Sequence, residues 1–215
     1  MDTDIGTDID DTWALGLLLK CPELDLKLVT TVNGDTKYRT RIAAKLMEVA
    51  GCNVPIGIGI QSSCEARPQY EWVKDYDLTM YPGQIFEDGI GAIIETIKKS
   101  QEERVKIICI GPLTNMGEVV GRYPEIAEKA TIISMSGSIN KGLGGKTGRV
   151  AEYNIVQDIK AAQKVFSSNI PIALTPLDTC GIVKLDGNNY TKVRNSQCEI
   201  TKAILENYRI WDSFY

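Results

Sequence analysis

The sequence predicts an α/β fold in which a Rossmann-like, mostly parallel sheet is flanked by helices. Apolar, β-branched segments recur along the 215-residue chain and alternate with segments of helical periodicity. These apolar segments are continuous runs, which is typical of parallel strands covered on both faces. Apolar residues make up 43% of the chain, which is enough to fill one sizeable core. A single domain over residues 1–215 is therefore expected.

The chain begins with a turn that is crowded with aspartates, and residues 2–11 are called the acidic turn below. The apolar run 13–19 follows it and predicts a buried helix whose N-terminus presents the carboxylates. Only Met1 precedes the turn, so the first strand of the sheet is expected to be missing. The aspartates of the turn are Asp2, Asp4, Asp8, Asp10 and Asp11.

The remaining elements alternate between strands and helices. A region rich in Gln, Pro and Tyr shows no periodicity and predicts a long loop over residues 61–86. The glycine-rich, basic segment 140–149 predicts a flexible surface loop, because the known phosphate-binding motifs fail there. The other predicted elements are strands 26–32, 54–60, 105–110, 131–135 and 170–174, and helices 36–50, 86–100, 116–123, 158–166 and, in the main, 187–210.

Composition excludes several classes of protein. The net charge of −4 and the lack of a basic patch argue against nucleic-acid binding. Histidine is absent, so imidazole catalysis and histidine-based zinc sites are excluded. No segment is long enough to span a membrane, and no signal peptide is expected. The six cysteines are scattered without a CxxC pair, which predicts reduced thiols in a cytoplasmic protein.

The acidic turn favours a cation site. Two carboxylates a few ångströms apart repel each other by about 1 kcal/mol in water and by several times more inside a protein. A cation can offset this repulsion, and oxygen-only ligands suit Ca²⁺ or Mg²⁺. The alternative is a solvated acidic turn in which Asp8 or Asp10 caps the following helix. The spacing fits neither an EF-hand loop nor a D-x-D-x-[TV] phosphatase motif, which makes a metal-dependent phosphatase a weaker hypothesis.

Polar residues follow the predicted strands at their carboxyl ends. Ligands of parallel sheets bind beyond those ends, so these side chains are expected to converge on one rim. The acidic turn would join the rim if a strand preceded it. The residues in question are Asp35, Thr114, Asn115, Ser136 and Asp178.

Four segments resemble, in order, motifs of the inosine–uridine-preferring nucleoside hydrolase family. The acidic turn resembles the family's D-x-D-x-G…D-D signature with a loop two residues longer, and TTVNGD (residues 30–35) resembles the strand that ends in a Gly-Asn pair. GPLTN (residues 111–115) is similar to the family's GPLTN segment. AEYN (residues 151–154), followed by Asp158 and an Ala-Ala pair, is similar to its AEFN…D…AA segment. The resemblance covers nearly the whole chain.

The resemblance implies a Ca²⁺-dependent hydrolase that cleaves the N-glycosidic bond of ribonucleosides to give ribose and free base. It implies that Asp4, Asp11 and the main-chain carbonyl of Thr114 hold the metal, and that Asp2 supports them. Asp4 would also take the proton of a metal-bound water. Such an enzyme belongs to the glycosidases and serves purine or pyrimidine salvage. Its partner is a small nucleoside, and related enzymes are commonly dimers or tetramers.

Substrate contacts are implied at other positions. Asp10 would hold a ribose hydroxyl, and Glu152 and Asn154 would hold ribose hydroxyls from the far side. Asp35 stands where the family usually has a substrate-binding Asn. Aromatic residues are candidates to stack a base, although ordinary packing is the plainer interpretation for each of them. They are Tyr70, Trp72, Tyr76, Tyr81 and Trp211.

Three departures from the family pattern leave an alternative open. A late metal-binding Asp is expected beyond Tyr215, a leaving-group His is absent, and Lys146 or a neighbour stands near a usual ribose-binding Asn. The domain is therefore expected to lack its first strand and its C-terminal part. The alternative function is a catalytically impaired ribose- or metal-binding fragment of such an enzyme.

Overall fold

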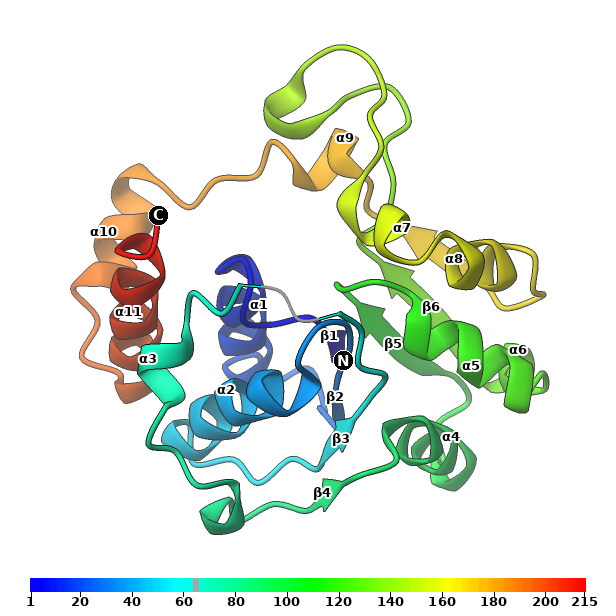
Figure 1. Cartoon of the computed structure of the whole chain (residues 1–215), viewed down its shortest axis with the longest axis horizontal. Coiled ribbons are helices and arrows are strands. Elements are labelled where there is room, and N and C mark those ends of the chain that lie inside the picture. Colours follow the sequence, from blue (N-terminus) through cyan, green and yellow to red (C-terminus); the bar gives the residue numbers. More distant parts are fainter. Residues whose placement is uncertain (64–65) are drawn as a thin grey trace.

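A computed structural model of the chain describes residues 1–63 and 66–215. These residues form a seven-stranded sheet in the order β4-β3-β2-β1-β5-β6-β7, and every neighbouring pair is parallel. Helices α1 and α2 lie on one face, and α4, α5 and α8 lie on the other (Figure 1). The predicted fold class is confirmed.

The strands are β1 (Asp2–Thr3), β2 (Val29–Thr31), β3 (Ile56–Ile58), β4 (Ile85–Phe86), β5 (Val105–Cys109), β6 (Ala130–Ser134) and β7 (Ile172–Leu174). The α-helices are α1 (Asp10–Leu19), α2 (Thr36–Val49), α3 (Tyr70–Val73), α4 (Gly89–Lys99), α5 (Thr114–Arg122), α6 (Ile126–Lys129), α7 (Tyr153–Gln157), α8 (Ile159–Phe166), α9 (Leu177–Cys180), α10 (Gly187–Arg194) and α11 (Glu199–Asp212). Two short 3-10 turns, η1 (Leu78–Met80) and η2 (Leu143–Gly145), complete the description.

The first strand is present, so the prediction that it is missing was wrong. The main chain of β1 pairs with β2 on one side and with β5 on the other. Thr30 N donates to Met1 O (2.8 Å), Val32 N donates to Thr3 O (3.0 Å), and Ile110 N donates to Asp2 O (2.9 Å). A strand of two polar residues has no apolar run, and for that reason the sequence pattern does not reveal it.

The segment predicted as one long loop is more ordered than expected. Its described residues contain α3, η1 and the edge strand β4. Each of these elements has two to four residues, which is too few for a periodicity to appear. Residues 64 and 65 of that predicted loop lie outside the described part of the chain.

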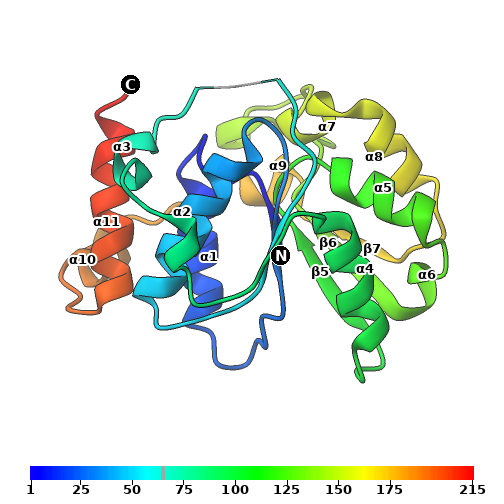
Figure 2. The same cartoon turned by 60° about the horizontal axis from the view of Figure 1, so that its bottom comes forward.

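Two apolar clusters fill the space on either side of the sheet. One packs β5 and β6 against α4, α5 and α8, and the other packs β2 and β3 against α1, α2 and α3. Helix α11 contributes Ile200, Ala203 and Ile204 to the second cluster. Figure 2 shows α10 and α11 as an outer layer beyond α1 and α2. The C-terminal helix therefore covers the helices that follow the acidic turn and strand β2.

The state of the cysteines and the length of the helices bear on two further predictions. The described cysteines Cys21, Cys52, Cys109, Cys180 and Cys198 are free, and Cys64 lies outside the described residues. No helix in the described ranges combines the length and apolar character needed to cross a membrane. A cytoplasmic location stays a prediction.

Two glycines on α5 make a matched test of helix packing. A Cβ on Gly117 would lie 2.8 Å from Ala161 Cβ and 3.0 Å from Ala161 Cα, whereas a Cβ on Gly121 would meet only the flexible end of Lys164. We expect Gly117→Ala to lower the free energy of unfolding by about 1–3 kcal/mol, because α8 must move away. We expect Gly121→Ala to be neutral or to stabilise by up to about 1 kcal/mol. Urea unfolding measures both, and equal effects would contradict this packing.

Candidate active site

The acidic turn lies at the carboxyl edge of the sheet, because its residues 2 and 3 form β1 and residues 4–11 follow the end of that strand. The GPLTN segment follows β5, which pairs with β1, and therefore reaches the same edge. Gly111 in this segment packs directly on the turn. A Cβ there would lie 2.8 Å from Asp4 N and 2.9 Å from Asp4 Oδ1, so only glycine allows this approach. The structure thus brings Asp4 beside the segment that contains Thr114.

Asp2 is fully buried within β1, with 1% of its surface exposed. Its Oδ1 accepts hydrogen bonds from Thr30 Oγ1 (2.5 Å) and Asn115 Nδ2 (2.8 Å). Its Oδ2 is buried without a hydrogen-bond partner among the described residues. Burial raises the pKa of Asp2 to about 6, although the two hydrogen bonds act to lower it. This carboxyl therefore supports the turn from within the sheet.

Asp4 and Asp11 form a buried pair of carboxylates, each with 7% of its surface exposed. Burial raises the pKa of Asp11 well above its ordinary value, and the charges of Asp4 and Asp10 raise it further. The Thr3 hydroxyl donates to Asp11 Oδ1 and partly offsets this effect. Asp10 itself is exposed, and its pKa is raised by partial loss of hydration and by the charge of Asp8. The acidic turn therefore gathers carboxylates whose ionisation is opposed by burial and by the neighbouring charges.

The capping role that the solvated alternative gives to Asp8 or Asp10 is wrong. Ile9 occupies the N-cap position of α1, and no side chain caps this helix, so neither Asp8 nor Asp10 serves that role. Within residues 1–63 and 66–215, no group of three or more Asp, Glu or Cys side chains is arranged to hold a metal ion.

Asp35 has a structural role in the described chain. It is the N-cap of α2, where its Oδ1 accepts a hydrogen bond from Tyr38 N (3.0 Å). Its Oδ2 forms an ion pair with Arg67 Nη2 (2.6 Å). Both carboxylate oxygens thus fix the start of α2 and the segment before α3.

Glu152 and Asn154 lie at the start of α7 and are both buried. Glu152 accepts hydrogen bonds from the main-chain N–H groups of Gly137 (2.9 Å), Asn154 (2.8 Å) and Ile155 (3.2 Å). Asn154 Nδ2 donates to Ile110 O (3.0 Å) and Met135 O (3.1 Å). Ile110 in turn pairs with β1, so both side chains belong to the edge that carries the acidic turn.

Of the other predicted rim residues, only some join the turn. Asn115 is fully buried and links β1, β2 and the segment after β3, because it donates to Asp2 Oδ1 (2.8 Å) and Thr31 O (3.1 Å) and accepts from Ile60 N (2.9 Å). Asp178 instead lies partly exposed on α9 and accepts from Ile139 N and Asn140 N, both at 2.8 Å. It anchors the start of the glycine-rich loop.

Gln69 supports the acidic turn, and the sequence analysis did not predict this role. It is fully buried, its Nε2 donates to Asp8 O (3.0 Å), and its Oε1 accepts from Thr12 Oγ1 (3.1 Å) and Asn207 Nδ2 (2.7 Å). It therefore ties the acidic turn to α1 and α11. A single Gln in an aperiodic segment gives no signal of such a role.

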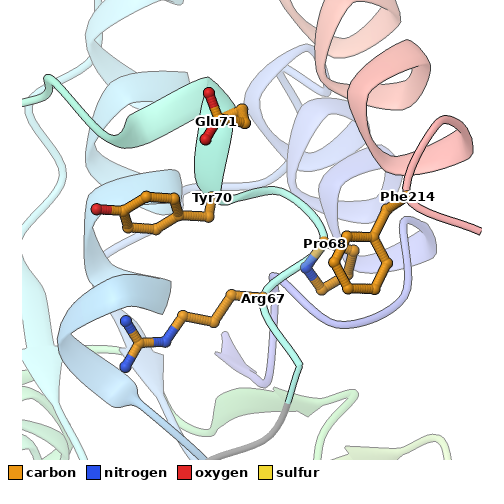
Figure 3. A pocket seen from close by; sticks show the side chains of 5 residues that line it. All are labelled: Arg67, Pro68, Tyr70, Glu71 and Phe214. Atoms are coloured by element: carbon orange, nitrogen blue, oxygen red, sulfur yellow. The ribbon is translucent and has the colours of Figure 1, made fainter.

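The aromatic candidates divide between packing and surface. Trp72 and Tyr81 are buried in the core, whereas Tyr70 lines a surface pocket of about 390 Å³. Figure 3 shows this pocket between the segment that begins α3 and the end of the chain, lined by Arg67, Pro68, Tyr70, Glu71 and Phe214. Trp211 Nε1 donates to Thr7 O (3.0 Å), which fastens the C-terminal helix to the acidic turn.

Comparison with known proteins decides the family. The model of the family described as inosine-uridine preferring nucleoside hydrolase matches residues 1–215. The chain belongs to this family. Nucleoside hydrolases act on ribonucleosides, and the predicted resemblance is confirmed.

Two curated relatives and two solved structures illustrate the match. The chain is 31% identical to the non-specific ribonucleoside hydrolase RihC of Salmonella agona (strain SL483), over 97% of this chain and 71% of the relative. It is 32% identical to an uncharacterised protein of Schizosaccharomyces pombe (strain 972), over 83% of this chain and 60% of the relative.

The fold matches the plant nucleoside hydrolase PpNRh1 with a TM-score of 0.79 at 23% identity, over 99% of this chain and 70% of that one. It matches an inosine-uridine preferring nucleoside hydrolase of Bacillus anthracis with a TM-score of 0.79 at 20% identity, over 97% of this chain and 74% of that one. This member of the family therefore spans 60–74% of the length of these four proteins.

The raised pKa of Asp2 predicts a pH dependence of stability. Because the folded pKa of about 6 lies above the ordinary 3.8, ionisation of Asp2 costs folding free energy as the pH rises through this window. The shift corresponds to a loss of about 3 kcal/mol of unfolding free energy. This loss begins near pH 4 and is complete above pH 6. We expect Asp2→Asn to flatten the decline of unfolding free energy between pH 4 and 7 by this amount. Urea unfolding in a chelating buffer measures it, and parallel curves for the two chains would refute the assignment.

Proposed function

We propose that this chain hydrolyses the N-glycosidic bond of ribonucleosides to ribose and free base, with Ca²⁺ as its cofactor. The observation that carries the proposal is the buried pair Asp4 and Asp11 at the carboxyl edge of the sheet, in a chain of the nucleoside hydrolase family. Parallel sheets bind their ligands at this edge. A role in purine or pyrimidine salvage belongs to the same proposal.

The residues of the turn fit a hard divalent cation. Carboxylate oxygens are the ligands that Ca²⁺ prefers. Burial and then the charges of Asp4 and Asp10 raise the pKa of Asp11, and a cation would relieve that repulsion. Asp4, Asp11 and the main-chain oxygen of Thr114 would hold it. When bound, the cation would bind a pair of ribose hydroxyls and lower the pKa of a water.

The side chains around the turn would then act on the substrate. Asp4 is the base that accepts the proton of the attacking water. Asp10, which is exposed, would accept a hydrogen bond from a ribose hydroxyl, and Glu152 and Asn154 would hold ribose hydroxyls from the far side. Cleavage of a ribose–base bond develops positive charge on the sugar ring, which these carboxylates stabilise.

Activity should depend on the buried pair. We expect the chain to hydrolyse a p-nitrophenyl riboside in the presence of Ca²⁺ and to lose this activity in a chelator. Asp4→Asn and Asp11→Asn should each lower kcat/KM by about a hundredfold or more, because each removes a charged ligand of the cation. Asp25→Asn, which removes an exposed carboxylate far along the chain from the turn, is the matched control and should leave kcat/KM unchanged.

A second candidate is a protein that binds ribose or a metal without hydrolysis. It is favoured by the three main-chain hydrogen bonds that already occupy Glu152, and by the engagement of Asp35 in a helix cap and an ion pair. Isothermal titration with ribose and Ca²⁺ separates the candidates. Binding without turnover of the riboside would favour the second, and turnover abolished by Asp11→Asn would favour the first.

A further inference from the structure

Arg39 is the largest fully buried side chain of the described residues, and it lies beneath the acidic turn. Only 2% of its surface is exposed, although it comes from helix α2. Its Nη1 donates to the main-chain oxygens of Asp4 and of Ile5 (3.0 Å), and its Nη2 donates to Thr7 Oγ1 (3.0 Å). The guanidinium therefore contacts the acidic turn at three residues between positions 4 and 7.

The same guanidinium also holds the end of strand β2. Arg39 Nε donates to Asn33 O (2.7 Å), and Asn33 adopts a left-handed conformation with φ of 65°. Gly34 follows with φ of 54°, and a Cβ there would lie 3.0 Å from Arg39 Nη2. A left-handed non-glycine residue costs about 1–3 kcal/mol, so the surrounding contacts must enforce it. The left-handed conformation of residues 33 and 34 leaves room for the guanidinium, and the carbonyl oxygen of Asn33 accepts a hydrogen bond from it.

The acceptors named above are neutral oxygens of the main chain and of a hydroxyl, so these contacts fix the geometry of the backbone. A planar guanidinium can reach three or four acceptors in fixed directions, whereas the single ammonium of a lysine cannot. The positive charge also favours the ionised form of Asp11. Arg39 thus joins α2, the end of β2 and the acidic turn at one point.

We propose that Arg39 is a positioning residue for the candidate cation site, which fixes the main chain of the acidic turn so that the carboxylates of Asp4 and Asp11 stay together. The inference rests on the proposed function for the identity of the bound ion. The direction in which the Ca²⁺ affinity changes when Arg39 is replaced distinguishes a positioning role from an effect of its charge. A fixed positive charge near the site repels Ca²⁺, so removing that charge alone would strengthen binding, whereas removing a positioning group weakens it.

The test uses the whole chain with Arg39→Gln, Arg39→Lys and the control Lys37→Gln. Lys37 is on the same helix, and its loss changes the net charge equally, but its side chain is 65% exposed and pairs with Glu87 at the surface. Calorimetric titration with Ca²⁺ gives the affinity, and hydrogen–deuterium exchange of residues 4–12 reports the order of the turn. Circular dichroism confirms that each variant is folded.

We expect Arg39→Gln to weaken Ca²⁺ binding by about tenfold to a hundredfold and to speed exchange within residues 4–12. Arg39→Lys should recover less than half of the loss on a logarithmic scale, and Lys37→Gln should match the native chain. If Arg39→Gln fails to fold, Thr7→Val removes one acceptor only, and we expect binding about threefold weaker with faster exchange in the turn.

Tighter or unchanged Ca²⁺ binding in a folded Arg39→Gln chain would overturn the inference, as would an equal loss in Lys37→Gln. A third outcome is that Arg39→Gln exchanges faster within the turn alone while the native chain binds no Ca²⁺. That result would support the positioning role and defeat the calcium part of the proposed function. The two failures are therefore distinguishable.

Discussion

The repulsion between two buried carboxylates, Asp4 and Asp11, is the constraint on which the rest of this edge depends. Water cannot hydrate either group well, and each raises the cost of ionising the other. The surrounding chain opposes this repulsion with neutral and charged donors. Thr3 donates to Asp11, Arg39 holds the main chain of Asp4, and Gln69 holds that of Asp8. The turn is thus fixed from three different elements before any ligand arrives.

Several residues expected to bind substrate also build the fold. Glu152 caps α7 and reaches Gly137, Asn154 joins the ends of β5 and β6, and Asp35 caps α2. Substituting them would change local structure together with any substrate contact. Kinetic effects at these positions are informative only beside a measurement of stability, whereas exposed Asp10 does not carry this ambiguity.

Local patterns predicted most of the architecture, and contacts between distant segments account for what was missed. The alternation of strands and helices, the buried helix after the turn and the polar strand ends are visible as runs and periodicities. Strands β1 and β4 have two residues each, which no pattern can reveal. Arg39 occupies a helix with an amphipathic sequence, and its burial depends on contacts with Asp4, Ile5 and Thr7, which lie 32 to 35 positions earlier in the sequence. The candidate site was predicted through motifs, because motifs record such distant contacts indirectly.

The two-residue strand at the centre of the sheet couples the halves of the molecule. Within the described sheet, β1 and the adjoining Met1 are the only main chain that joins strands β2, β3 and β4 to strands β5, β6 and β7. The rest of the acidic turn starts at the next residue. A solute captured by the turn would therefore bridge the seam, and both halves would open as one cooperative unit rather than in succession. Recognition and folding cooperativity are in this way properties of the same few atoms.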